Sequence, residues 1–231
     1  MFSKKIEISA QKSDYYSYTL SELKECFLTV PKNYPSYFKN IPKHIFDEHL
    51  NANMHVHKTL KSCSGFLNLF RRSFVFTCPF DIHLLFDGDG NVTYSSVGVS
   101  GDKSTLFYEV HPNFQFLNHV PNHNLQMVLK IRTRMFINSD TPLLIHKNFW
   151  SFNNIEVIPG IITDSYTDDL SFFIPIYKNQ KELLINKGTM LFFITPLSVK
   201  KHLISYIIKD RNDKFKKTFS NLKKYIIKEP L

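Results

Sequence analysis

The stretch Phe80–Phe86, FDIHLLF, alternates apolar and polar residues except at Leu85, and is followed by the turn DGDGN and a run of β-formers that begins VTY. The apolar residues at positions 80, 82, 84 and 86 share one face of an extended chain, because successive side chains of a strand point to opposite faces. A turn rich in Asp, Gly and Asn between two β-forming runs is typical of a β-hairpin. The sequence therefore predicts an antiparallel hairpin over residues 80–94.

Short apolar runs of the same kind continue along the chain. Leu125–Thr133 alternates apolar and polar residues, which is typical of a half-buried strand. Turn residues separate the later runs, which are Leu143–Ile145, Ile155–Ile162, Leu170–Tyr177, Leu183–Ile185 and Met190–Thr195. Several short strands at this spacing predict a mainly β protein, an antiparallel β-sandwich or barrel of the β-clip or jelly-roll type, rather than alternating βαβ units.

The sequence divides into three parts within one compact domain. Residues 1–62 are predicted to be irregular and partly helical, with a short helix over Ser21–Leu28 behind Thr19. Residues 63–211 form the predicted β-rich body. Residues 212–231 predict an amphipathic C-terminal helix, because apolar residues recur there at the spacing of one helical face: Phe215, Phe219, Leu222 and Ile226.

Composition and cysteine content limit the class of protein. The chain has 231 residues, 43% of them apolar, with 22 Phe and 7 Gly, which excludes a disordered or collagen-like chain. Cys26, Cys63 and Cys78 do not provide a closed disulfide framework and point to a reducing compartment. The first residues lack the apolar core of a signal peptide, and no run reaches the ~20 apolar residues of a membrane helix. We therefore expect a protein that is neither secreted nor transmembrane and has no membrane partner.

The charge of +9 is concentrated at the C-terminus. Residues 200–231 hold ten Lys or Arg against three acidic residues, a balance of +7, whereas the preceding 199 residues carry +2. Such a tail can contact nucleic acid, an acidic protein or an anionic surface, or it can be the solvated face of a helix. The candidate nucleic-acid contacts are Lys214, Lys216, Lys217, Lys223 and Lys224.

Histidines provide the only candidate metal ligands, His111, His119 and His123. An H-x3-H pair binds a metal from one face of a helix, but Pro121 lies between the second and third histidine and argues against a helix there. No third ligand is fixed by the sequence. A metal site is therefore disfavoured, and we expect no cofactor.

Sequence motifs for catalysis are absent. The chain contains no P-loop, no GxGxxG and no GxSxG. The turn Asp87–Asn91 has the oxygen-ligand spacing that opens an EF-hand loop, but Val92 stands where the loop needs glycine. We therefore predict no catalytic residues, and the sequence favours a protein without enzymatic activity.

The stretch from Glu156 to Leu197 combines an EVIPGIITDSY run, an apolar strand over residues 170–177 and the segment LLINKGTMLFFI. It resembles the β-clip core of dUTPases and dCTP deaminases, in which a Gly-Ile-Ile-Asp-x-x-Tyr strand is followed by a hairpin, a Lys-Gly turn and a closing apolar strand. The resemblance implies a nucleotide-binding fold. In those enzymes the Asp activates water and the Tyr packs on the sugar.

This chain departs from the β-clip pattern at the catalytic position. Thr163 stands where the Asp would be, and a threonine hydroxyl does not act as a general base near neutral pH. Asp164 is one place later, which on a strand is the opposite face. The resemblance therefore implies ligand binding rather than catalysis, with Asp81, Asp164 and Tyr166 as the candidate ligand-binding residues.

A second resemblance covers more of the chain. The segment Cys63–Phe66 and the run from Phe70 to Asp81 are similar to uncharacterised proteins of tailed phages, especially those of marine cyanobacteria, and Val157–Gly160 and Gly188–Leu191 follow in the same order. The chain departs from that group at Ser64, Gly65 and Cys78. The resemblance implies a viral origin and supplies no mechanism.

Three functions remain open from the sequence. The leading hypothesis is a non-enzymatic, β-rich phage protein of the host cytoplasm or the virion. Its partner would be a protein, either a second copy of the same chain or a viral or host protein. The first alternative is a β-clip nucleotide-binding protein or enzyme. The second is non-specific nucleic-acid binding through the basic C-terminal helix.

Overall fold

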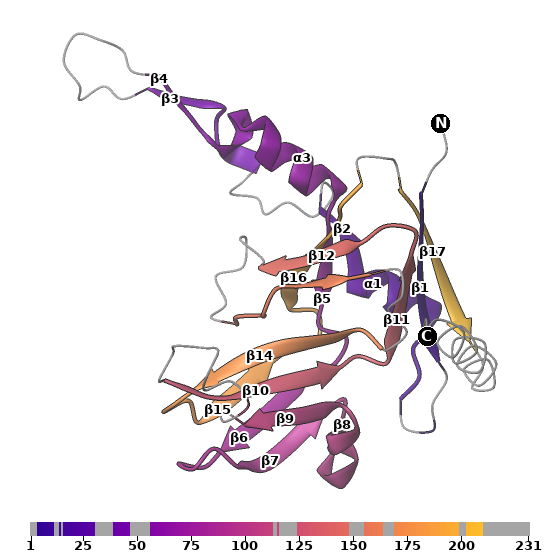
Figure 1. The fold of residues 1–231 in the computed structure, drawn as a ribbon, viewed down its shortest axis with the longest axis vertical. Helices are drawn as coiled ribbons and strands as arrows, with labels where there is room; N and C mark the ends of the chain where they lie inside the picture. Colours follow the sequence, from indigo (N-terminus) through magenta and orange to yellow (C-terminus); the bar gives the residue numbers. More distant parts are fainter. Residues whose placement is uncertain are drawn as a thin grey trace, which may run out of the picture.

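The computed structural model describes residues 4–11, 14, 16–30, 39–46, 56–112, 115, 124–147, 155–163, 169–198 and 202–209. Within these residues the chain is mainly β, as predicted, and no sheet closes into a barrel. The predicted C-terminal helix over residues 212–231 lies outside the described residues. The arrangement of the elements is shown in Figure 1.

Four sheets form the body of the molecule. The largest has the strand order β13 (Gly160–Ile162), β12 (Leu143–Lys147), β16 (Met190–Pro196), β5 (Phe74–Thr77) and β2 (Phe27–Thr29). A second sheet has the order β15 (Glu182–Ile185), β6 (Ile82–Phe86), β7 (Val92–Val97) and β8 (Val99–Ser100). The third is β14 (Ser171–Tyr177), β10 (Leu125–Arg132) and β9 (Tyr108–Pro112), and the fourth is β11 (Met135–Ser139), β1 (Lys4–Gln11) and β17 (His202–Lys209).

The predicted hairpin is present as β6 and β7, which pair antiparallel from Ile82 opposite Val97. Its turn is held by the side chain of Asp87, whose Oδ1 accepts the backbone N–H groups of Asp89 at 3.0 Å and Asn91 at 2.7 Å. This bonding of a side chain to the backbone a few residues on is the reason that Asp favours turns. The hairpin predicted from the alternation is therefore confirmed.

The core between the sheets is built largely from phenylalanine. The rings of Phe76 and Phe192 stack with centroids 4.7 Å apart, and Phe172 lies 5.8 Å from Phe192. All three side chains are buried. Burying a side chain of this size stabilises the fold by roughly 1.5–3 kcal/mol, so packing accounts for the Phe residues that are buried in the described part.

The N-terminal segment is more regular than the sequence predicted. The expected short helix is α1 (Leu20–Cys26), and Thr19 and Glu22 form a capping box at its start. The same segment also contains β1, which lies at the centre of its sheet, pairing antiparallel with β11 and parallel with β17. Ile6, Ile8 and Ala10 alternate with polar residues and are buried, a strand pattern that the prediction of irregular structure overlooked.

The stretch that resembles a β-clip core contributes strands to three different sheets. β13 and β16 lie in the five-stranded sheet, β14 pairs with β10, and β15 pairs with β6. Of the predicted strand Ile155–Ile162, only β13 is extended in a ladder, although Ile158 N–H still donates to the carbonyl of Phe173 at 2.9 Å. Strands β14 and β15 are therefore consecutive in sequence but have different ladder partners.

Two short helices complete the described elements, η2 (Leu60–Ser62) and η3 (Gly101–Leu106), together with a longer one, α3 (Ser64–Arg72). The residues 60–70, which fit either a helix or an extended segment, are thus mainly helical. No helix within the described ranges combines the length and the apolar character that are needed to cross a bilayer.

Candidate functional site

An arm projects from the β body at the upper left of Figure 1. We define the arm as residues 39–46 and 56–72, which comprise the two-stranded sheet β3 (His44–Phe46) and β4 (Val56–Lys58), η2 and α3. In the ribbon, His44 pairs with Lys58 and Ile45 pairs with His57. The arm is therefore a β-ribbon carried on a helix.

The helix α3 anchors the arm to the body. Phe70 is 1% exposed and packs edge-on against Phe193 of β16, with the ring centroids 5.1 Å apart. Val30 and Val75 complete this small cluster. Arg72 donates from its guanidinium to the carbonyl of Ser198 at 3.1 Å. The base of the arm is thus packed and hydrogen-bonded, which fixes the direction in which the arm leaves the body.

Hydrogen bonds between η2 and the segment before β3 hold the root of the ribbon. The hydroxyl of Thr59 donates to the carbonyl of Pro42 at 2.6 Å, and the hydroxyl of Ser62 donates to the carbonyl of Lys43 at 2.6 Å. Lys61 donates from Nζ to the carbonyl of Lys39 at 2.5 Å. These bonds join two pieces of chain that are separated by the residues between β3 and β4.

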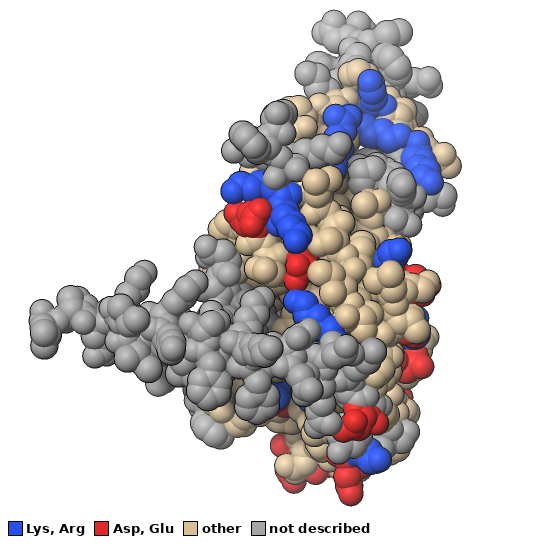
Figure 2. All heavy atoms as spheres, turned by 90° about the vertical axis from the view of Figure 1, so that its right-hand side faces the viewer, with Lys and Arg blue, Asp and Glu red and all other residues tan. Residues whose placement is uncertain are grey.

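The arm is strongly basic. By sequence, its two segments contain six Lys and Arg residues, Lys39, Lys43, Lys58, Lys61, Arg71 and Arg72. They contain no Asp or Glu, whereas Asp47 and Glu48 belong to residues 47–55, outside the described part. Lys39, Lys43 and Arg71 are exposed. Figure 2 shows Lys and Arg side chains gathered toward the upper part of the molecule and Asp and Glu side chains mainly below.

Several basic residues of the body are paired with carboxylates. Lys187 Nζ lies 2.8 Å from Glu22 Oε1, and Lys209 Nζ lies 2.8 Å from Glu7 Oε1. The hydrogen bond from Lys209 is the main reason that the pKa of Glu7 lies below its usual value, and that from Lys187 does the same for Glu22. The contrast makes the arm the strongest candidate binding surface among the described residues.

The candidate ligand-binding residue Asp81 has a structural contact. Its Oδ1 accepts the backbone N–H of Lys187 at 2.7 Å and so holds the turn between β15 and β16. In that turn Gly188 has φ +84°, a conformation that favours glycine. The predicted Lys-Gly turn is therefore present, and one face of the Asp81 carboxylate is used to fix it. Asp164 and Tyr166 lie outside the described residues.

The candidate metal ligand His111 lies on β9 beside an ion-pair group. Its Nδ1 is 3.1 Å from Gln115 Oε1, and its Nε2 is 4.0 Å from Glu109 Oε1. Glu109 also accepts from Arg132 at 2.6 Å, and this bond is the main reason that the pKa of Glu109 is lowered. His119 and His123 lie outside the described residues, within which no three His, Cys, Asp or Glu side chains are grouped to hold a metal ion.

A hydroxyl–imidazole chain lies under α3 and was not predicted. Thr195 Oγ1 is 2.8 Å from His146 Nε2 and 2.5 Å from Ser73 Oγ, which in turn donates to the carbonyl of Leu69. Such a contact resembles a nucleophile beside a base, but Thr195 is 1% exposed and Ser73 is 2% exposed, so a substrate has no access to either hydroxyl. Burial lowers the pKa of His146, which favours its neutral form. The chain therefore satisfies buried polar groups between the sheet and α3.

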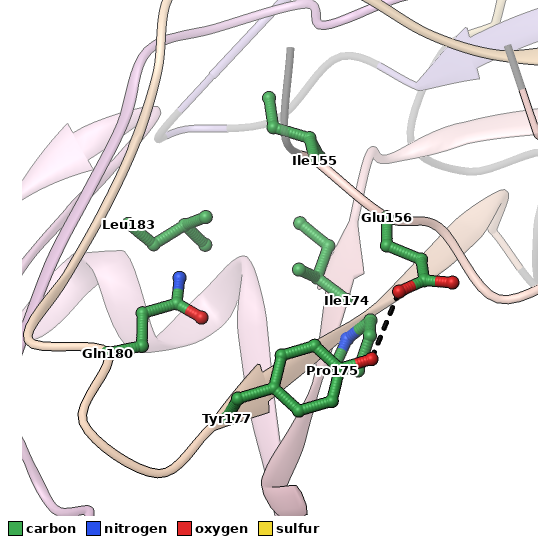
Figure 3. A pocket seen from close by; sticks show the side chains of 7 residues that line it. All are labelled: Ile155, Glu156, Ile174, Pro175, Tyr177, Gln180 and Leu183. Atoms are coloured by element: carbon green, nitrogen blue, oxygen red, sulfur yellow. Dashed lines mark hydrogen bonds between the residues drawn. The ribbon is translucent and has the colours of Figure 1, made fainter. Parts of the chain in front are cut away.

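A small pocket of about 160 Å³ lies where β14 turns into β15. Figure 3 shows its lining, in which apolar side chains of the body are joined by Glu156, Tyr177 and Gln180. The hydroxyl of Tyr177 donates to Glu156 Oε2 at 3.0 Å. A pocket for a nucleotide-sized ligand is typically 300 Å³ or more, so this one is too small for a nucleotide in the observed shape.

The predicted nucleic-acid contacts Lys214, Lys216, Lys217, Lys223 and Lys224 all lie outside the described residues. The arm was missed from the sequence because the predicted division after residue 62 separates its two basic segments. A count of charge over residues 39–72, instead of over the tail alone, would have found it.

No family model, no curated protein and no solved structure matches this chain. The resemblances to tailed-phage proteins and to the β-clip enzymes therefore stay predictions.

Proposed function

We propose that the protein is a non-enzymatic binding protein that engages nucleic acid through its basic arm. The observation that carries the proposal is the six Lys and Arg residues of the arm with no carboxylate in its described part. A cluster of Lys and Arg residues attracts a polyanion, because bound counterions are released from the phosphates when the protein's cations replace them.

The shape of the arm supports nucleic acid over a compact anion. The ribbon β3–β4 is two strands wide, and a two-stranded ribbon fits the major groove of a duplex. The basic residues run from the ribbon to the last turn of α3, where Arg71 and Arg72 lie. This elongated distribution follows a backbone of repeated phosphates better than it surrounds a single one. We expect contacts to phosphates rather than to base edges, and hence weak sequence preference.

The absence of enzymatic activity is part of the proposal. The imidazole of His146 contacts a hydroxyl that is buried, and the carboxylate of Asp81 is hydrogen-bonded to the backbone of a turn. Neither group is presented to a substrate by the described residues. These observations support a binding role.

The proposal is tested with a charge-reversed arm. Fluorescence anisotropy with a labelled duplex of about 30 base pairs at about 50 mM salt measures the dissociation constant. We expect the triple variant K39E/K43E/R71E to bind at least about tenfold more weakly than the wild type. For the wild type, log K against log salt should have a slope of about −3 to −5, as expected for roughly four to five phosphate contacts.

A matched control makes the same change of charge on the body, K103E/K178E/K181E. A tail variant, K216E/K217E/K223E, tests the alternative of binding through the C-terminus. Wild-type affinity in the arm variant, or an equal loss in the body control, would contradict the assignment to the arm. A loss in the tail variant alone would transfer the function to the tail.

A further inference from the structure

The pocket at the β14–β15 junction has an apolar floor. Ile174 is 2% exposed and Leu183 is 5% exposed, and Ile155 and Pro175 form the walls beside them. Its volume of about 160 Å³ accommodates one amino-acid side chain rather than a large ligand. Tyr177 and Gln180 line the pocket from the tight turn between β14 and β15. In this turn the backbone N–H of Gln180 donates to the carbonyl of Tyr177 at 3.0 Å.

The rim of the pocket carries the carboxylate of Glu156. Glu156 Oε2 accepts the Tyr177 hydroxyl, as the dashed line in Figure 3 marks, which leaves the second carboxylate oxygen for another donor. In the described part of the chain, no Lys, Arg or His forms an ion pair with Glu156. Desolvation and the neighbouring carboxylate raise the pKa of Tyr177, so its hydroxyl stays protonated and continues to donate.

We propose that this pocket binds one cationic side chain, Lys or Arg, of a protein partner. The aliphatic stem of such a side chain lies against Ile174 and Pro175, and its charged head reaches Glu156. Long basic side chains combine an apolar stem with a polar head in this way. An acidic side chain is repelled by the carboxylate, and a purely apolar one removes Glu156 from water without replacing the lost hydrogen bonds. The side-chain amide oxygen of Gln180 offers a further acceptor to a guanidinium.

This site is separate from the arm and serves a different class of partner. The arm attracts phosphates, whereas the pocket selects a positive charge, so one molecule is able to hold nucleic acid and a basic protein segment at the same time. The inference does not depend on nucleic-acid binding, and each of the two proposals can fail alone.

The test uses n-butylguanidinium as the probe and the full chain as the receptor. Methyl NMR spectra follow Ile155, Ile174 and Leu183 during titration, with n-butanol and butyrate as neutral and anionic probes that have alkyl stems of similar length. We expect butylguanidinium to bind with a millimolar dissociation constant, which is ordinary for a ligand of about eight non-hydrogen atoms. Its affinity should exceed that of n-butanol and of butyrate by about tenfold, because its hydrogen bond to the carboxylate is charge-assisted.

The variant E156Q removes the charge but keeps an oxygen that accepts the Tyr177 hydroxyl. We expect butylguanidinium to bind this variant about tenfold more weakly, while n-butanol binds it as it binds the wild type. The control D102N removes a carboxylate on η3 and should leave both affinities unchanged. Equal binding of butylguanidinium and n-butanol, wild-type affinity in E156Q, or unshifted methyl signals up to about 100 mM probe would each overturn the proposal.

Discussion

The arm and the β body of this protein differ in how their basic residues are placed relative to acidic ones. In the body, Lys187 and Lys209 are paired with Glu22 and Glu7, and the core beneath them is filled by Phe residues from several sheets. In the arm, basic residues are collected without acidic partners in the described part, and a small cluster around Phe70 holds the arm in place. The buried core that stabilises the fold and the basic residues of the proposed nucleic-acid surface therefore lie in separate parts of the chain, so each can be changed alone.

The largest expected effect is on the body. Phe192→Ala removes a fully buried ring that stacks on Phe76 and contacts Phe172. We expect the free energy of unfolding to fall by about 3–5 kcal/mol, the usual cost of deleting a buried phenylalanine. Urea denaturation followed by circular dichroism measures this loss. As a control, Leu60→Ala on the arm, where the side chain is 51% exposed, should leave stability within about 0.5 kcal/mol of the wild type.

A smaller effect is expected at the junction of the two regions. Phe70→Ala deletes the ring that packs on Phe193 in the satellite cluster. The global free energy of unfolding should fall by about 2–3 kcal/mol, because the cluster is smaller than the main core. Native-state hydrogen exchange should show that the amides of α3 lose more protection than those of β10. Equal loss of protection in both elements would mean that the arm and the body unfold as one unit.

Acid should weaken the contact between α3 and the sheet through His146. Its folded-state pKa lies below the usual value of a histidine, about 6.5, because burial disfavours the imidazolium. The unfolded chain therefore binds more protons as pH falls below about 6.5, and stability decreases until the folded pKa is passed. Denaturation at several pH values should show this decrease in the wild type and a shallower one in His146→Gln. The same slope in both proteins would remove His146 as the cause.

The smallest effect is expected from the ion pairs of the body. Lys187→Met removes the contact with Glu22, whose side chain is 28% exposed, while the backbone N–H of residue 187 keeps its bond to Asp81. A half-exposed pair contributes about 0.2–1 kcal/mol, and the loss should disappear at high salt. Lys181→Met is the control on the same sheet. A loss above about 2 kcal/mol would show that body charges matter more than surface pairs usually do.

Local patterns in the sequence predicted local structure well. The alternation over 80–86 and the Asp-Gly-Asn turn predicted the β6–β7 hairpin, and Thr19 with Glu22 accounts for the start of α1. The same alternation over Ile6–Ala10 indicates a strand, but the prediction treated residues 1–62 as one irregular segment because Pro31, Pro35 and Pro42 interrupt its later part. Ladder partners were not predictable, because β1 joins strands that lie far along the chain.

The candidate sites depend on contacts between distant residues, which a sequence does not display. The arm brings Lys39 and Lys61 together through hydrogen bonds across the ribbon root. Asp81 meets the backbone of Lys187, and the pocket combines Glu156 with Gln180. The sequence identified Asp81 as a candidate side chain for a ligand, but only the fold shows that it fastens a turn.

The parallel ladder between β1 and β17 has a consequence for how the chain reaches its native state. Lys4 pairs with His202 and Gln11 with Lys209, so β1 is synthesised well before the strand that completes this ladder. Until then, the edge of β1 that faces β17 exposes unpaired backbone groups, which other chains can use for pairing. Closing so long a loop is slow, so the nascent chain passes through a period in which it is exposed to aggregation.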